Sequence, residues 1–103
     1  MKEITSSEQF ETVSKQGKSI MMFTADWCKD CVFIEPFLPS IVEAHPDYQF
    51  YKIDCDKLMK LSRNLRVLGI PSFVAFADGA EIGRLVSRER KTKEEIEDFI
   101  KSL

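Results

Sequence analysis

Two cysteines separated by two residues are the part of this sequence best suited to chemistry. The segment reads Trp27-Cys28-Lys29-Asp30-Cys31. A thiolate is both the nucleophile of thiol–disulfide exchange and a metal ligand, so this spacing supports either a redox-active dithiol or half of a zinc site. In the redox case, Cys28 attacks a disulfide to give a mixed disulfide. Cys31 then attacks the Cys28 sulfur and releases the reduced product.

A metal site would need further ligands, and the sequence offers few. Zinc takes four ligands, and the remaining candidates are Cys55 and His45. An iron–sulfur cluster fails on the same ligand count. We therefore expect no metal and no organic cofactor. We interpret Cys55 as a partly buried structural thiol, with a regulatory thiol as the alternative, and His45 as a solvated loop residue.

Composition and charge restrict the classes of partner. The chain has 103 residues, of which 44% are hydrophobic and 31% charged, enough for one packed domain over residues 1–103. Fifteen Lys and Arg against 17 Asp and Glu give a net charge of −2, which lacks the basic footprint of a nucleic-acid-binding protein. The longest apolar runs are about four residues, far short of the ~20 that a membrane helix needs.

The N-terminal sequence and the cysteine count indicate a reducing compartment. Residues 1–8 contain neither an apolar stretch nor the small-residue cleavage site of a signal peptide. The three cysteines are an odd number, which argues against a framework of structural disulfides. We expect a cytoplasmic protein that does not bind membranes and is a monomer.

Strands are predicted on both sides of the cysteine pair. Residues 19–24 form a nearly continuous apolar run, typical of a strand buried on both faces. Two further strands are predicted over residues 49–54 and 72–77. The dipeptide Asp78-Gly79 is a strong hairpin signal, so we expect the chain to turn there into a last strand over residues 81–86.

Helices are predicted between and after these strands. Apolar residues recur with helical spacing from Cys31 to about residue 42, and Pro36 should kink that helix. The other helices are predicted from their caps. These are a capping box at Ser6 and Gln9 with a stop at Gly17, a cap at Asp56, and a capping box at Thr92 and Glu95.

The cysteine pair therefore falls between a buried strand and the start of a helix. The unpaired N–H groups and partial positive charge of a helix N-terminus favour an anion. We expect Cys28 to face solvent at the first turn, with Cys31 one turn along on the same side. Strands that alternate with helices and end in a hairpin predict a mixed α/β sheet covered by helices on both faces.

The residues around the cysteine pair resemble those of the thioredoxin family, and the similarity runs from Ser6 to Leu103. The matching motifs are Asp26-Trp27-Cys28-Lys29-Asp30-Cys31, Pro36, Gly69-Ile70-Pro71-Ser72 and Asp78-Gly79. The resemblance implies the thioredoxin fold, with a central, mostly parallel mixed sheet, a C-terminal antiparallel hairpin and helices on both faces. It implies a thiol–disulfide oxidoreductase that reduces protein disulfides and takes electrons from a separate reductase similar to thioredoxin reductase.

The same resemblance assigns residues to substrate binding. It implies that Pro71 is a cis proline facing the two cysteines. Trp27 and Ile70 would form the apolar lips of a shallow groove, in which the backbone of Ile70 meets an incoming substrate strand. A trans Ile70–Pro71 bond that only opens a strand is the alternative, and cis is the rarer form of such bonds in general.

Several positions depart from the family pattern. A buried Asp usually lies six residues before the first cysteine, where this chain has Met22, and Phe50 stands at the position of its usual Lys partner. Lys29-Asp30 replaces Gly-Pro between the cysteines. Lys29 would favour a thiolate at Cys28 and Asp30 would oppose it, so we expect these two residues to tune the redox potential in a direction that the sequence leaves open.

Other functions stay possible from the sequence. A thioredoxin-like binding or adaptor module with little turnover is the main alternative, because an apolar pair replaces the usual buried ion pair. Oxidation or isomerisation of disulfides are variants of the redox function. Near Ser87, a groove-lining Gly of the family is replaced, which would narrow or re-specify the groove. The charged residues 88–91 are interpreted as a solvated turn, with a partner-docking patch as the second interpretation.

Overall fold

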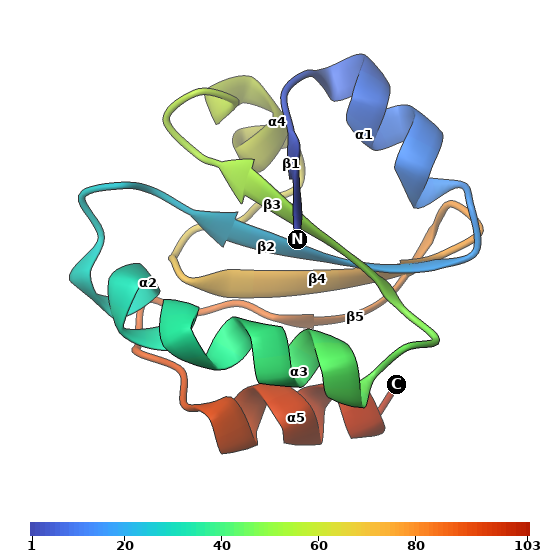
Figure 1. The fold of residues 1–103 in the computed structure, drawn as a ribbon. Helices are drawn as coiled ribbons and strands as arrows, with labels where there is room; N and C mark the ends of the chain where they lie inside the picture. The colour runs from blue at the N-terminus through green and yellow to red at the C-terminus, as the bar shows by residue number, and fades with distance from the viewer.

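The computed structural model describes all residues 1–103, which form a five-stranded sheet flanked by helices (Figure 1). The strands are β1 (Lys2–Ile4), β2 (Lys18–Thr24), β3 (Gln49–Asp54), β4 (Ser72–Ala77) and β5 (Ala80–Leu85). The helices are α1 (Ser7–Ser14), α2 (Lys29–Ile34), the 3₁₀ turn η1 (Glu35–Phe37), α3 (Leu38–Ala44), α4 (Met59–Asn64) and α5 (Lys93–Lys101).

The sheet is mixed, as predicted, with strand order β1-β3-β2-β4-β5. β3 pairs in parallel with both β1 and β2, while β4 is antiparallel to both β2 and β5. β4 is therefore the single strand that runs against the other four. β1 was not predicted, because a three-residue strand with one buried residue, Ile4, carries too short a pattern to stand out.

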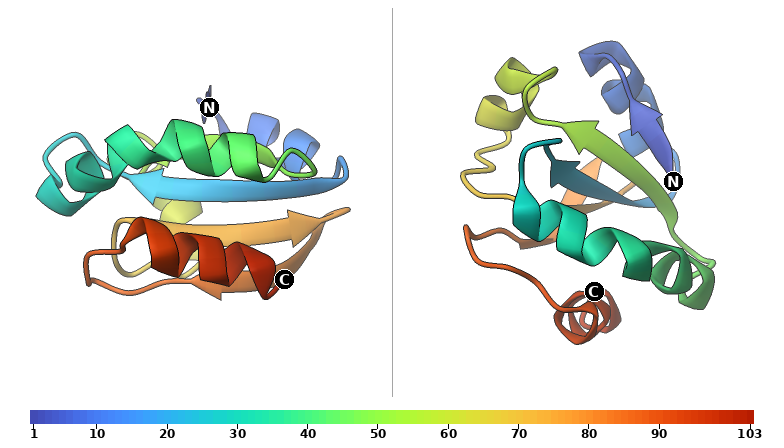
Figure 2. Two further views of the ribbon diagram at one scale, coloured as in Figure 1. Left: turned by 60° about the horizontal axis from the view of Figure 1, so that its bottom comes forward. Right: turned by 60° about the vertical axis from the view of Figure 1, so that its left-hand side comes forward.

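Helices cover both faces of the sheet (Figure 2). Apolar residues of α2, α3 and α5 pack with one face of β2 in a core cluster that includes Ile20 and Met22. Residues of α1 and α4 pack on the other face, in a cluster that includes Met21 and Phe23. The central strand β2 is therefore buried on both faces, as its apolar run predicts. None of the helices combines the length and the hydropathy that a membrane span requires.

The predicted helix breaks and turns are correct in most places. The helix that follows the cysteines breaks at Pro36, so that α2, η1 and α3 are three short elements in place of one kinked helix. The hairpin turn has the positive φ angles expected for Asp-Gly, 49° at Asp78 and 91° at Gly79. α1 ends at Ser14, and Gly17 lies in the following turn with φ of 67°.

One predicted cap is wrong. Asp56 does not begin α4, which starts at Met59 after Leu58 and has no side-chain cap. The carboxylate of Asp54 takes over the turn instead, because its Oδ1 accepts hydrogen bonds from the backbone N–H groups of Asp56 at 2.8 Å and Lys57 at 3.2 Å. This leaves the Asp56 side chain available for a contact near the cysteines.

The capping box at Thr92 can be tested by stability. The Thr92 hydroxyl accepts from the Glu95 amide at 3.1 Å, and the Glu95 carboxylate accepts from the Thr92 amide at 3.3 Å. Thr92→Ala should lower the free energy of unfolding in urea by about 1 kcal/mol. Thr12→Ala, an exposed position inside α1, is the matched control and should leave stability unchanged or slightly higher. Equal losses in both variants would show that the cap contributes nothing.

Candidate active site

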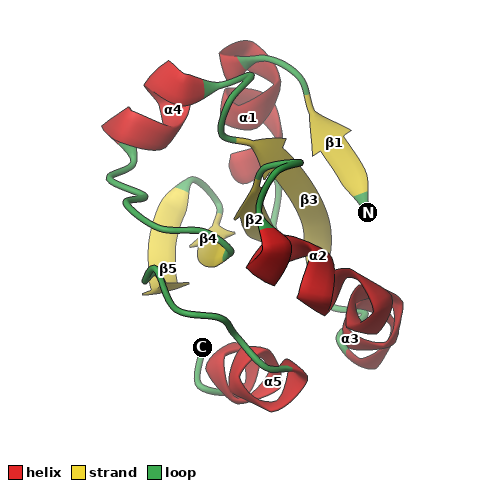
Figure 3. Cartoon of the chain, turned by 90° about the vertical axis from the view of Figure 1, so that its left-hand side faces the viewer, coloured by secondary structure: helices red, strands yellow, loops and turns green.

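The cysteine pair lies where β2 ends and α2 begins, at the end of the sheet seen in Figure 3. Cys28 is the N-cap residue of α2, and its sulfur accepts a hydrogen bond from the backbone N–H of Cys31 at 3.2 Å. The Cys28 thiol also points to the carbonyl oxygen of Ile70, 3.9 Å away. The first sulfur is therefore held between the start of a helix and the segment that precedes β4.

Both cysteines are more buried than the sequence suggested. Cys28 is 6% exposed and Cys31 1%, so the expectation that Cys28 faces solvent was wrong. The reason is the covering segment, because Ile70 packs against a small cluster formed by Cys28, Cys31 and Ala25. All three cysteines of the chain are free thiols in this structure.

The environment of Cys31 strongly disfavours its thiolate in the reduced protein. Burial raises the pKa of Cys31 to about 12, and the hydrogen bond with Cys28 adds to the increase. The hydroxyl of Thr24 and the backbone amide of Ala25 act in the opposite direction and lower this pKa. Cys31 is thus a protonated thiol at neutral pH, with two hydrogen-bond donors beside it that favour its ionised form.

A groove of about 600 Å³ opens beside Cys28. Its lining comes from three segments distant in sequence, and the residues are Trp27, Cys28, Lys29, Asp30, Leu68, Gly69, Ile70 and Arg88. The structure therefore brings Trp27 and Ile70 into one groove with the first cysteine. Pro71 is buried and does not line the groove, although the Ile70–Pro71 peptide bond is cis, as the resemblance implied.

The side chain of Trp27 is held by Asp56, which the sequence had predicted to be a helix cap. The side chain of Trp27 is 68% exposed, yet its indole N–H donates to Oδ2 of Asp56 at 2.8 Å. This hydrogen bond ties the loop before Cys28 to the turn after β3. A carboxylate after a strand gives no sequence signal for a contact 29 residues away, so this role of Asp56 could not be read from the pattern.

The two residues between the cysteines differ in their partners. Lys29 is exposed at the rim of the groove, whereas Asp30 accepts a hydrogen bond from Nε of Arg90 at 2.9 Å. The Arg90 guanidinium also lies over the ring of Phe33, 4.1 Å from its centroid. The interpretation of residues 88–91 as a solvated turn holds for residues 88–90, which are exposed, although Arg90 also binds α2. It is wrong for Lys91, which is only 1% exposed.

Gly69 allows the segment before β4 to approach the segment after β5 closely. A Cβ atom at Gly69 would overlap the backbone carbonyl of Ser87 and the amide of Arg88. The Ser72 hydroxyl also reaches Ser87, donating to its carbonyl oxygen at 3.5 Å. Close backbone approach thus explains the Gly at position 69. It brings Arg88 to the groove, whereas Ser87 itself stays outside the lining.

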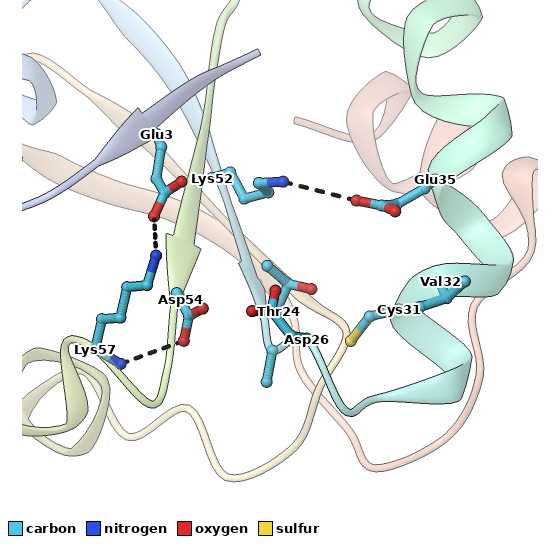
Figure 4. Close-up of a pocket in the computed structure, with 10 residues that line it drawn as sticks. Glu3, Thr24, Asp26, Cys31, Val32, Glu35, Lys52, Asp54 and Lys57 are labelled. Carbon is cyan, nitrogen blue, oxygen red and sulfur yellow. Dashed lines mark hydrogen bonds and ion pairs between the residues drawn. The ribbon is translucent and has the colours of Figure 1, made fainter.

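A polar cavity of about 140 Å³ lies behind Cys31 (Figure 4). The Cys31 sulfur points from α2 toward the end of β2, where Thr24 and Asp26 lie. Charged side chains line the rest of the cavity, namely Glu3, Glu35, Lys52, Asp54 and Lys57. Four of them form ion pairs, Lys52 with Glu35 at 3.6 Å and Lys57 with Glu3 at 3.4 Å. The cavity gives the second cysteine a polar route toward water.

Met22 and Phe50, the apolar residues at the positions of the family's usual Asp and Lys, are part of the core. Met22 is 1% exposed and Phe50 is 7% exposed, and both belong to the cluster between the sheet and α2, α3 and α5. Lys52 lies opposite Met22 in the β2–β3 register, but its ammonium group pairs with Glu35 at the protein surface. No carboxylate therefore lies beneath the cysteines at the position that Met22 occupies.

The other candidate ligands do not join the cysteine pair. Cys55 is partly buried against the cluster on the α1 and α4 face, and burial raises the pKa of its thiol. His45 caps the end of α3 with Nε2 buried and without a hydrogen-bond partner, so it is less solvated than predicted. No group of three or more His, Cys, Asp and Glu side chains is placed to hold a metal ion.

Comparison with known proteins identifies the family of this chain. The family model for thioredoxin matches residues 1–102. Thioredoxin H-type 1 of Nicotiana tabacum is 38% identical over 95 residues, which cover 91% of this chain and 73% of that protein. Mitochondrial thioredoxin-3 of Saccharomyces cerevisiae is 32% identical over 84 residues, 81% of this chain and 66% of that protein.

Solved structures agree with the sequence comparisons. The crystal structure of oxidised yeast mitochondrial thioredoxin 3 superposes with a TM-score of 0.88 at 30% identity, covering 100% of this chain and 95% of that one. Thioredoxin from Trypanosoma brucei brucei gives a TM-score of 0.82 at 29% identity, over 96% and 89% of the two chains. The predicted thioredoxin fold is confirmed, and the chain belongs to the thioredoxin family of thiol–disulfide oxidoreductases.

Proposed function

We propose that this protein reduces protein disulfides, with Cys28 as the attacking cysteine and Cys31 as the resolving one. The observation that carries the proposal is the position of the Cys28 sulfur, which lies at the helix start, accepts the Cys31 N–H at 3.2 Å and opens onto the groove. A sulfur in this position gains from the helix N-terminus when it carries negative charge.

In the first step, the Cys28 thiolate attacks one sulfur of a substrate disulfide. A new bond forms from Cys28 to that sulfur, the substrate disulfide breaks, and the other substrate sulfur leaves as a thiolate that takes a proton from solvent. Trp27 and Ile70 line the groove together with Cys28, and we expect an extended substrate segment to lie against them there. Pro71 holds the segment that carries Ile70.

In the second step, Cys31 attacks the Cys28 sulfur and releases the second substrate thiol. The hydrogen bond with Cys28 that raises the pKa of Cys31 belongs to the reduced protein. Once Cys28 is bonded to substrate it carries no negative charge, so this opposition to ionisation ends when Cys31 has to react. Its proton can leave through the polar cavity, and Thr24 and Ala25 then stabilise the thiolate.

We further propose that Lys29 and Asp30 tune the redox potential of the pair. The ion pair of Asp30 with Arg90 supports this idea, because it offsets the negative charge that would otherwise oppose a Cys28 thiolate. Lys29 keeps its positive charge at the rim of the groove. Asp30 and Lys29 thus place one paired and one unpaired charge beside the cysteines, and this is the basis of the proposed tuning.

The cellular setting is proposed from the family and the cysteines. An odd number of thiols suits a reducing compartment, which we take to be the cytoplasm. A reductase similar to thioredoxin reductase would return two electrons to the oxidised pair, and the protein would act as a monomer in electron transfer. Some of its relatives are mitochondrial by name. The proposed function therefore depends on a reducing environment and not on the cytoplasm in particular.

A binding or adaptor module with little turnover is the second candidate function. Met22 and Phe50 favour it, because the apolar core beneath the cysteines offers no proton acceptor at that position. The intact dithiol and the polar cavity behind Cys31 favour the reductase. Equilibration of the Cys28/Cys31 pair with glutathione would give its reduction potential and separate a reductase from an oxidant or isomerase.

The roles of the two cysteines can be tested by reduction of insulin with dithiothreitol. Cys28→Ser should lower the rate to that of dithiothreitol alone, because the nucleophile is gone. Cys31→Ser should also lose turnover, but it should accumulate a covalent adduct through Cys28 that mass spectrometry detects. Cys55→Ser is the matched control and should keep at least half of the wild-type rate. A wild-type rate equal to that of Cys28→Ser would instead identify a binding module.

The apolar position beneath the pair gives a second test. Met22→Asp would restore a buried proton acceptor and should increase the rate of insulin reduction several-fold near neutral pH. The buried carboxylate should also lower the free energy of unfolding by about 3 kcal/mol. Met22→Asn is the control, since it has the same shape without a titrating group. A rate that Met22→Asp does not raise at any pH would contradict the idea that the missing proton acceptor at position 22 slows the reaction of Cys31.

A further inference from the structure

The groove beside Cys28 carries more positive than negative charge. Three charged residues line it, Lys29 and Asp30 from the start of α2 and Arg88 from the segment after β5. Asp30 is the one negative group among them, and Arg90 pairs with its carboxylate at 2.9 Å. The chain as a whole has a net charge of −2, so this groove is opposite in sign to the protein that surrounds it.

Lys29 and Arg88 have no carboxylate partner within the chain. Both residues are exposed, and none of the six ion pairs of the structure includes either of them. A carboxylate that enters the groove can therefore pair with either cation without breaking an existing ion pair. The carboxylate of Asp30 does not compete for them, because it is already bound to Arg90.

The backbone fixes both cations at the groove. Lys29 is the first residue of α2 and follows Cys28, which is the N-cap. Arg88 is held from the other side, because the segment after β5 passes so close to Gly69 that a Cβ atom there would lie 2.6 Å from the Arg88 amide nitrogen. The positions of the two charges are therefore set by the same junctions that place the reactive sulfur, although their side chains stay in solvent.

The rest of the groove offers apolar contact. Leu68 is 76% exposed and Trp27 is 68% exposed, which makes them the two most exposed large apolar side chains of the chain. Both line the groove. The hydrogen bond from the indole to Asp56 at 2.8 Å occupies Oδ2 of that carboxylate, and Asp56 does not line the groove. Exposed apolar side chains gathered at one groove are typical of a surface that binds a partner.

We propose that Lys29 and Arg88 are specificity-determining residues, which select protein disulfides whose flanking segment carries acidic side chains. The inference rests on the proposed function and names its substrate class. Electrostatic complementarity favours the encounter with such segments and opposes basic ones. Leu68 and Trp27 contact the apolar parts of the same segment, so a protein segment fits this groove better than a small anion. The exchange at Cys28 proceeds as described above.

The test compares three synthetic peptides that share one intramolecular disulfide and differ only in the two residues flanking it, which are Glu, Gln or Lys. Reduced protein carrying Cys55→Ser is mixed with each peptide at pH 7, and the second-order rate constant of its oxidation is measured by acid quench and chromatography. Each value is divided by the rate constant of mercaptoethanol, an uncharged thiol, with the same peptide. The quotient removes differences in the intrinsic reactivity of the three disulfides.

The Glu peptide should react about tenfold faster than the Lys peptide at low salt, because an exposed ion pair is worth about threefold and repulsion acts by a similar factor. The Gln peptide should lie between them. At about 1 M salt, where the Debye length is about 3 Å, the ratio should approach one.

Variants assign the preference to the two cations. Arg88→Gln should lower the ratio of Glu to Lys peptide to about threefold, and Arg88→Glu should lower it further. Lys29→Gln should lower it in the same direction, and the ratio is unaffected by any change in the reactivity of Cys28 that acts on all peptides alike. Arg63→Gln is the matched control, because it removes the same charge from an exposed position of α4 outside the groove and should leave the ratio unchanged.

The outcomes separate this inference from the proposed function. Equal quotients for the three peptides in the wild type, or a faster Lys peptide, would overturn the inference. A preference for the Glu peptide that both Arg88→Gln and Lys29→Gln retain in full would also overturn it, as would an equal loss in Arg63→Gln. Peptides that the wild type reduces no faster than Cys28→Ser does would overturn the proposed function instead.

Discussion

The hydrogen bond from the Cys31 amide to the Cys28 sulfur depends on where β2 stops and α2 starts. β2 is buried on both faces, so its end cannot shift along the sheet without moving core side chains from one face to the other. That fixed end sets the short loop that leads to the first helical residue, Lys29, and puts Cys28 at the N-cap. The groove, the burial of Cys31 and the contacts of Asp30 all follow from this one junction.

Charge is arranged around the redox pair in an unusual way for its family. The side facing the sheet is apolar, with Met22 and Phe50 in the core, while the ionisable groups line a small cavity and the connection before α5. Burying an isolated carboxylate in the core would cost stability. Apolar residues at both positions of the family's usual Asp–Lys pair are therefore consistent with stable packing. The chain keeps polar access to Cys31 from its edges in place of a buried charge beneath it.

Most of the fold could be predicted from the sequence, because long apolar patterns and capping residues act locally. The strand over 19–24, the break at Pro36 and the Asp78-Gly79 turn all depend on neighbours a few residues apart. What failed depends on distant contacts. The burial of Cys28 is due to Ile70, and the loss of the Asp56 cap to competition from Asp54. The buried state of Lys91 comes from two backbone carbonyls, which a charge pattern does not reveal.

Trp27 is the only tryptophan of the chain, and the bond from its indole to Asp56 holds it beside the reactive sulfur. Its light emission therefore comes from one place in the molecule, without background from other indoles. A change in the bonding of the neighbouring sulfur alters the surroundings of that ring directly. We therefore expect the native fluorescence of this protein to change with its redox state, and no dye has to be attached near the groove.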